Sequence, residues 1–436
     1  QEYHAKEEYL VENYRSSRFI IDAASRCIDG AAERLKRDHR LRIDARRQAE
    51  PPGGAWTARD EVAGGKVQVL RVKGGQLSQA VAAVEELERL AALDPDWQWN
   101  RCAIVARNWT DLDPARSACM VHGIPVQSAR EELSSFWRAR ETQRLLRTLE
   151  SGDSTAIEAE EIRRYREDAG EGPWADLLAQ ALDELLLEEG QATVLPIAFV
   201  RNWLGEWSKE IRRRQQGLLL TSAHRAKGLE FDHVVILDGR WNAASDAEDP
   251  DTARRLYYVS MTRARETLAL VRLDDAGRPD VRDTPLRAKR EERAASLLQP
   301  LGNHPSVLER EVPRPDISDR RLDIRIAECT MKDVVLSFAG WRAAHSRTHR
   351  AIAALSPGDP LSLSHEDGQW KVLDREGRQV GRMAKSWTLP RGMTIARASV
   401  QGIFTRWADD GEDEERRRTL RSETWEVVVP QFFLVT

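Results

Sequence analysis

The stretch Leu218-Leu-Leu-Thr-Ser-Ala-His-Arg-Ala-Lys-Gly-Leu-Glu-Phe-Asp-His-Val-Val-Ile-Leu237 decides the fold of this chain. Two apolar runs, 218–221 and 233–237, flank a polar turn in which small residues gather with a histidine, a lysine and a glycine. Short apolar runs bounded by a turn are typical of buried strands in a parallel sheet. Open sheets of this kind bind ligands at a strand end, so the turn is a candidate site.

The same alternation of strands and helices extends outward from this stretch in both directions. Ser16 and Ser17 open an amphipathic segment that reads as a helix. Apolar periodicity then predicts the following elements: strands over 66–72, 101–107 and 267–271, and helices over 77–93, 114–122 and 251–262. The pattern predicts an α/β fold with a parallel sheet.

Residues 151–210 differ from their surroundings in charge. They hold five basic and fourteen acidic residues, and Trp174, Leu178, Leu182 and Leu185 form the apolar face of a helix. We interpret this segment as an acidic helical insertion, whose charge makes it a poor groove for DNA.

The C-terminal part reads as a separate small domain. Residues 273–318 are rich in Pro, Asp and Arg and are interpreted as a linker. Turn signals then punctuate alternating strands at 360–363, 369–373 and 379–383, which predicts a β-meander within a β-rich domain over 319–436. Lys385, Trp387 and Arg391 follow it; such residues can stack bases or fill the core of a small barrel.

Composition bounds the class of protein. The 436 residues are 41% hydrophobic and 32% charged, with a net charge of −4, so any nucleic-acid surface is a local patch. No apolar run approaches the roughly 18 residues of a membrane span, and residues 1–10 have neither a basic nor an apolar run of the signal-peptide kind, so neither a membrane span nor a secretory signal is expected. The four cysteines lie far apart without a CxxC pair, which favours a reducing, cytoplasmic setting.

Three segments resemble motifs of the UvrD/Rep-type superfamily 1 DNA helicases. The stretch at 218–237 resembles motif V. Ala253-Arg-Arg-Leu-Tyr-Tyr-Val-Ser-Met-Thr-Arg-Ala-Arg265 resembles motif VI, and Val11-Glu-Asn-Tyr-Arg-Ser-Ser17 resembles motif IV. Residues 102–125 resemble motif IVa. The opening segment and the tail are also similar to UvrD-like halves of long RecQ-family helicase chains.

The resemblance implies a domain plan. Residues 1–150 and 211–272 correspond to the second RecA-like motor domain, a parallel sheet with helices on both faces, called 2A in the family. The acidic segment 151–210 corresponds to a reduced 2B-like insertion. The β-rich tail resembles the SH3-like or HIRAN-like modules that accompany helicases.

The resemblance also implies a nucleotide site. Arg15 and Arg263 would approach the γ-phosphate of ATP, and Glu230 would lie near the ribose. Lys227 and Gly228, in the turn that precedes Glu230, are also expected to bind the nucleotide. Chemistry supplies a reason for the arginines, because a planar, permanently charged guanidinium stabilises the negative charge of phosphoryl transfer without proton exchange. Taken alone, however, Arg15 is more simply a surface cation that caps a helix.

The implied nucleic-acid contacts come from two of the motifs. Thr221 and His224 resemble positions that touch single-stranded DNA, and Arg107 resembles a phosphate contact. The family expects an Asn two positions after this arginine, where this chain has Trp109. Other residues have structural readings: Tyr257 and Tyr258 fit a helix core, and His345 and His349 are spaced like zinc ligands but lack a third ligand.

Parts of a complete motor are missing from this sequence. It contains no GxxxxGK[ST] phosphate loop, since Gly64-Gly65-Lys66-Val67 lacks both the spacing and the hydroxyl, and no acidic pair follows an apolar strand to bind Mg²⁺. We therefore expect a fragment that begins within a longer protein. The first motor domain, with the phosphate loop and the Mg²⁺ ligands, would lie upstream of Gln1.

These expectations combine into one function. The intact protein would be an ATP-dependent DNA helicase or translocase that uses ATP and Mg²⁺ and moves three-prime to five-prime on single-stranded DNA, whereas this fragment alone would be inactive. Its partners would be single-stranded DNA, the upstream motor domain of the same polypeptide and a protein that binds the β-rich domain, with no membrane. The alternative is a non-catalytic nucleic-acid- or protein-binding scaffold derived from a helicase half.

Overall fold

The computed structural model describes residues 12–31, 41–127, 136–151, 154–168, 170, 172–190, 194–214, 217–238, 241, 250–274, 301–366, 368–390, 392–410 and 417–435. The chain forms two compact units. The first comprises Gln1–Ala129 and Gln216–Leu322, and the second comprises Arg130–Gln215 and Asp323–Thr436. Each is described by itself.

A seven-stranded sheet forms the centre of the first unit. Its strand order is β11-β3-β10-β9-β4-β8-β5, and every neighbouring pair is parallel. The strands are β3 (Val67–Lys73), β4 (Cys102–Ala106), β5 (Val126–Gln127), β8 (Leu218–Ser222), β9 (Phe231–Asp238), β10 (Ala264–Asp274) and β11 (Val307–Glu311). A separate parallel pair joins β1 (Glu12–Asn13) to β2 (Arg42–Ile43).

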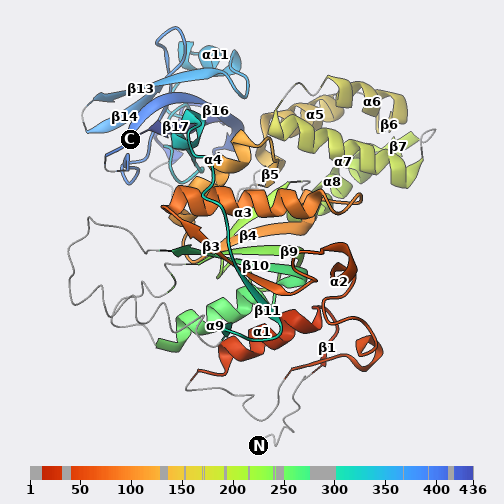
Figure 1. The fold of residues 1–436 in the computed structure, drawn as a ribbon. Coiled ribbons are helices and arrows are strands. Elements are labelled where there is room, and N and C mark those ends of the chain that lie inside the picture. The colour runs from red at the N-terminus through yellow and green to blue at the C-terminus, as the bar shows by residue number, and fades with distance from the viewer. Residues whose placement is uncertain are drawn as a thin grey trace, which may run out of the picture. The chain divides into compact units, whose positions relative to one another are not determined.

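Helices cover both faces of this sheet (Figure 1). On one face lie α1 (Arg18–Ile28) and α9 (Pro250–Met261), and on the other lie α3 (Gln76–Ala91) and α4 (Asp113–Val121). Each face of the sheet packs against its helices in a separate hydrophobic core. Successive strand residues point to opposite faces, so Val234 faces α1 and α9 and Val235 faces α3 and α4. The expected α/β fold, a parallel sheet with helices on both faces, is therefore confirmed.

Short elements complete the first unit. They are α2 (Trp56–Arg59) and the 3₁₀ turns η1 (Ala45–Arg47), η2 (Trp99–Arg101), η3 (Trp109–Asp111) and η6 (Arg320–Asp323). Among the described residues, no helix has the length and apolarity needed to cross a bilayer.

The expected linker over 273–318 is wrong for its second half. Residues 307–311 form β11 at the edge of the sheet, and Leu301 is buried in its core. A polar network holds β11 in place: the buried carboxylate of Glu86 accepts from Gln68 Nε2 at 2.6 Å and from Arg310 at 2.5 Å. The strand was not predicted because only two apolar residues precede three consecutive charged ones, Glu309 to Glu311, and charged side chains are common on edge strands. Residues 275–300 lie outside the described residues.

The second unit contains a six-stranded antiparallel sheet in the order β12-β17-β16-β13-β14-β15. The strands are β12 (Arg325–Glu328), β13 (Pro360–Glu366), β14 (Gln369–Leu373), β15 (Gln379–Arg382), β16 (Thr394–Trp407) and β17 (Thr424–Val435), with the helix α11 (Arg347–Ala353). The three strands of the expected meander are confirmed. Arg391 lies outside the described residues.

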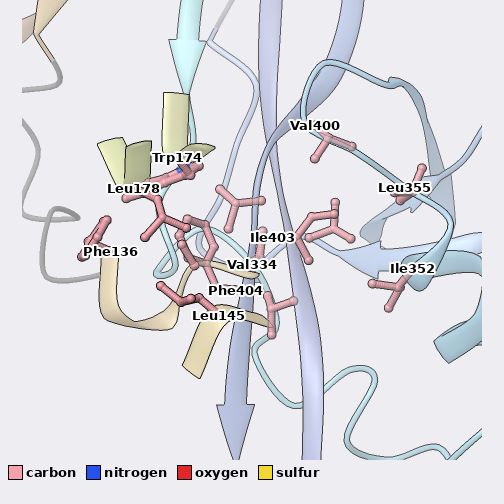
Figure 2. Close-up of a cluster of buried hydrophobic side chains, with 14 of the residues drawn as sticks. Phe136, Leu145, Trp174, Leu178, Val334, Ile352, Leu355, Val400, Ile403 and Phe404 are labelled. Carbon is pink, nitrogen blue, oxygen red and sulfur yellow. The ribbon is translucent and has the colours of Figure 1, made fainter. Parts of the chain in front are cut away.

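The acidic segment belongs to this same unit. It folds as α6 (Ala159–Glu167), α7 (Pro173–Glu189) and α8 (Ile197–Arg214), with the antiparallel pair β6 (Ala156–Glu158) and β7 (Val194–Pro196), and α5 (Arg140–Ser151) precedes it. Helices and sheet share one hydrophobic core (Figure 2). The Trp174 ring meets the Phe404 ring edge-on at 5.1 Å, and a Cβ on Gly402 would lie 2.6 Å from Trp174 Nε1.

Two expected domain boundaries change as a result. The boundary at 150 moves to Ala129, because α5 packs with the second unit, and the acidic insertion and the β-rich tail form one compact unit where separate domains were expected. A buried guanidinium joins α5 to the β-rich part: Arg140 is 2% exposed, pairs with Glu426 at 2.6 Å and donates to the carbonyl of Ile352 at 2.7 Å. Removing one partner of such a pair costs about 3–5 kcal/mol of stability.

Candidate functional site

The predicted site residues lie at opposite edges of the parallel sheet in the first unit. At the amino edge, β9 and β10 begin at the paired residues Phe231 and Ala264, directly after Glu230 and Arg263. At the carboxyl edge, β4 and β8 end at the paired residues Ala106 and Ser222. The segment 223–230 runs from one edge to the other, so a single turn joins both groups.

Hydrogen bonds fix three chain segments together at the amino edge. The hydroxyl of Ser16 donates to the carbonyl of Ala264 at 2.7 Å, and the N–H of Phe231 donates to the carbonyl of Arg263 at 2.9 Å. The motifs that the sequence places far apart, at 11–17, 218–237 and 253–265, therefore meet here.

Arg15 lies on a tight turn before α1. The side chain of Asn13 accepts from the backbone N–H groups of Arg15 and Ser16, both at 2.8 Å, which is an Asx turn. The Arg15 guanidinium forms an ion pair with Glu230, and the two side chains are 45% and 42% exposed. The pair is accessible to solvent, so an anionic ligand could replace the carboxylate.

Arg263 is anchored more firmly. Its Nε donates to the carbonyl of Val259 at 2.9 Å and its Nη1 donates to the carbonyl of Leu229 at 3.0 Å. Burial lowers the pKa of Arg263, repulsion from Arg15 lowers it further, and Glu230 opposes both. Arg15 pairs with Glu230 and the charges of both act on Arg263, so these three side chains carry a net positive charge that suits a phosphate group.

Lys227 and Gly228 are exposed in the turn between the two edges. Gly228 has φ of +88°, and a Cβ at this position would meet no atom within 4 Å, so the backbone conformation alone favours glycine. Their expected nucleotide contact stays a prediction.

At the carboxyl edge, His224 and Arg107 follow neighbouring strands. His224 is exposed, and the N–H of Ala223 donates to the carbonyl of Ala106 at 2.9 Å, which holds the two loops side by side. Thr221 does not fit its expected role in this conformation. Its side chain is 1% exposed inside β8, and its hydroxyl donates to the carbonyl of Ser222 at 3.4 Å.

Sequence reasoning missed one contact at this edge. The guanidinium of Arg225 lies over the ring of Trp109, 5.3 Å from its centroid. The sequence offered one indication of this contact, because Trp109 replaces the Asn expected from the family pattern. The pairing of β4 with β8 was needed to show that Arg225 is the residue that meets the indole.

A polar cavity of about 190 Å³ lies near the amino edge. Its lining residues are Arg59, Asp94, Asp96, Gln98, Arg101, Asp232, His233 and Glu266. Arg59 pairs with Asp94 at 3.0 Å and Arg101 pairs with Asp232, so these charges are matched within the fold. His233 stacks on Trp97 with centroids 4.3 Å apart, and burial lowers its pKa to about 3.

Metal ligands are not grouped in the described part of the chain. No cluster of three or more His, Cys, Asp or Glu side chains there could hold a metal ion. His349 instead lies 3.4 Å from the hydroxyl of Ser422.

Comparison with known proteins identifies the region that carries this site. Residues 217–271, which include Glu230 and Arg263, match the family model of the UvrD-like helicase C-terminal domain. The chain is also 27% identical over 293 residues to proteins named ATP-dependent DNA helicase UvrD2 from Mycobacterium bovis and Mycobacterium tuberculosis. That alignment covers 58% of this chain and 40% of each relative, so the chain spans less than half the length of these curated relatives.

A solved structure was also matched. It is the C-terminal domain of a possible DNA helicase from Lactobacillus plantarum, 13% identical, and the match covers 68% of this chain and 98% of that chain. The TM-score is 0.29, too low to equate the two folds.

Proposed function

Because residues 217–271 match the family model of the UvrD-like helicase C-terminal domain, we propose that this chain is the C-terminal part of an ATP-dependent DNA helicase or translocase that moves three-prime to five-prime on single-stranded DNA. It supplies Arg15 and Arg263 to the γ-phosphate of ATP. An upstream motor domain of the same polypeptide supplies the phosphate loop and the Mg²⁺ ligands. The observation that carries the proposal is the meeting of Arg15, Glu230 and Arg263 at the amino edge.

The chemistry of this cluster suits phosphoryl transfer. Negative charge spreads over the equatorial oxygens in the transition state, where Mg²⁺ and fixed cations neutralise it. Arg263 is held by two main-chain carbonyls, so its charge needs little reorganisation when the reaction occurs. Arg15 exchanges its ion pair with Glu230 for the phosphate, which leaves Glu230 available to the ribose hydroxyls.

The carboxyl edge of the same sheet serves nucleic acid. Exposed His224 and the nearby Arg107 contact the backbone of a single strand, which gives affinity without sequence preference. The segment 223–230 links this edge to Glu230, so nucleotide exchange at one edge moves the DNA contact at the other. This coupling is what a translocase requires, and a binding scaffold has no need of it.

The cysteines support a reducing, cytoplasmic setting. All four lie within the described residues, all are buried, and none forms a disulfide. Burial raises the pKa of Cys27 and Cys119 to about 12, which keeps both as unreactive thiols.

Mutation of the full-length protein that contains this chain tests the proposal. Arg263→Ala and Arg15→Ala should each lower DNA-stimulated ATP turnover by roughly 10³-fold, as removal of an arginine finger does. Nucleotide affinity should change far less, because the guanidinium acts on charge that develops in the transition state. Turnover and nucleotide affinity would be measured on the same preparations.

The matched control is Arg71→Ala. Arg71 belongs to the same unit and pairs with Glu309 and Glu311 at 3.3 and 3.0 Å, away from the site residues. This variant should keep wild-type turnover. If the Arg263 and Arg15 variants also stay within a few-fold of wild type, both arginines are structural and the scaffold alternative gains support.

A further inference from the structure

Trp109 and Arg225 meet where two neighbouring strands end. Trp109 follows β4 and Arg225 follows β8, strands whose last residues are paired in parallel register. The Arg225 guanidinium lies 5.3 Å from the centroid of the Trp109 ring. His224, the expected nucleic-acid contact, precedes Arg225 in the same exposed turn.

The indole is the fixed member of this pair. Trp109 is partly buried against the core that α3 and α4 cover. Its 3₁₀ turn is held by Asp111, whose carboxylate accepts from Gln76 at 3.1 Å and from Asn108 at 3.3 Å. Arg225 is exposed, and its backbone N–H donates to the carbonyl of Ser222 at 3.0 Å.

We propose that Arg225 is a further contact for the phosphodiester backbone of a single strand and that Trp109 positions it. This inference rests on the proposed function. An arginine side chain loses rotamer freedom when it binds a phosphate, and an aromatic face beneath it reduces that loss before the ligand arrives. A ring contact involves the face of a guanidinium, whereas its N–H groups lie at the rim, where a guanidinium can donate to two phosphate oxygens.

Charge at the carboxyl edge agrees with this assignment. Arg107, Arg225 and Lys227 are cations on the two loops, and Lys227 and Arg225 are both exposed. The nearby carboxylate of Asp111 is buried at 8% exposure and already accepts two side-chain hydrogen bonds. These two loops therefore carry three cations, although the whole chain has a net charge of −4.

Binding of a labelled oligothymidylate of about 15 nucleotides tests the proposal, because a length near this suits one binding site. Affinity of the full-length protein would be measured by fluorescence anisotropy over a range of salt concentrations. Arg225→Gln should weaken binding and reduce the slope of log affinity against log salt by about 0.7, the value for one phosphate of a single strand. Arg225→Lys should keep the slope and lose part of the affinity.

Trp109→Leu should weaken binding about two- to five-fold, as expected from one exposed cation–π contact, without a change in slope. The same change in an Arg225→Gln background should add nothing, because the indole acts through the guanidinium. Trp109→Phe keeps an aromatic face and covers the case in which the leucine variant does not fold. Arg144→Gln and Trp341→Leu, both exposed and in the second unit, are the matched controls and should bind like wild type.

The possible results distinguish a failure of this inference from a failure of the proposed nucleic-acid function. Wild-type affinity and slope in Arg225→Gln, together with weakened binding in Arg107→Ala or His224→Ala, overturn the inference alone. A loss in Trp109→Leu that persists in the Arg225→Gln background overturns the positioning role. A wild-type protein with no affinity for the oligonucleotide overturns both the inference and the proposed nucleic-acid function.

Discussion

The two edges of the parallel sheet hold their cations in different ways. At the amino edge, Arg263 donates to two main-chain carbonyls and Arg15 pairs with a carboxylate. At the carboxyl edge, Arg225 lies over an indole ring and His224 is exposed. The first arrangement holds a guanidinium by directional hydrogen bonds to the main chain, whereas the second holds one by a ring contact, which restrains its plane but not the direction of its N–H groups.

This difference suggests a division of labour. A transition state needs charge at a defined position, so a guanidinium held by directional hydrogen bonds suits phosphoryl transfer. A nucleic-acid backbone passes in many registers, so adjustable cations suit sequence-independent binding. Changes at the amino edge should therefore affect turnover strongly, and changes at the carboxyl edge should affect affinity modestly.

The largest expected effect concerns the isolated chain. The purified 436-residue protein should hydrolyse no ATP above background, because its sequence has no phosphate loop to place the nucleotide against Arg15 and Arg263. Phosphate release with and without single-stranded DNA measures this directly. DNA-stimulated turnover that disappears in Arg263→Ala would show that the amino edge is a complete site, and it would contradict the proposal that an upstream domain is required.

An intermediate effect is expected from His233 near the amino edge. Burial holds the pKa of this 4%-exposed side chain at about 3, compared with 6.5 for an ordinary histidine. The unfolded chain therefore takes up a proton as pH falls below 6.5, while the folded chain takes it up only near 3. Stability from His233 is complete above pH 6.5, and about 2 kcal/mol of it should be lost by pH 5.

Urea unfolding at pH 7 and pH 5 measures this loss. His233→Phe keeps a ring between Trp97 and Trp56 but cannot titrate, so it should show a smaller drop in unfolding free energy than wild type. Equal pH dependence in both proteins would mean that His233 is solvated in solution and that the amino edge is looser than described.

The smallest expected effect concerns His224. Replacing this exposed residue with alanine should weaken single-strand binding a few-fold and leave the melting temperature nearly unchanged, because it contributes little to the core. Anisotropy and thermal melting on the same variant separate the two properties. A loss of stability with intact affinity would remove His224 from the nucleic-acid surface.

Much of the first unit could be predicted from sequence because its strands are continuous apolar runs. The stretch 218–237 reads as two buried strands around a polar turn, and β8 and β9 occupy those positions. β11 was not predicted. An edge strand tolerates exposed charged side chains, and the charged residues Glu309, Arg310 and Glu311 made this segment resemble a linker. The shared core of the second unit was missed as well, because the packing of Trp174 on Gly402 joins residues far apart in sequence.

The candidate site was predictable only in part. Resemblance to motifs supplied Arg15, Glu230 and Arg263, and the structure brings these three together. The resemblance could not predict that Thr221 is buried, because a motif specifies the residue at a position and not the direction of its side chain. The contact of Trp109 with Arg225 required the register of β4 and β8, which the motifs do not contain.

The most direct test of two separate sites on one sheet is ATP turnover as a function of single-stranded DNA concentration in the full-length protein. The Arg107→Ala, His224→Ala double variant should need more DNA but approach wild-type turnover at saturation. Arg263→Ala should remain roughly 10³-fold below wild type at every DNA concentration. Recovery of the Arg263→Ala variant with added DNA, or a double variant that stays inactive at saturation, would contradict the separation of the two edges.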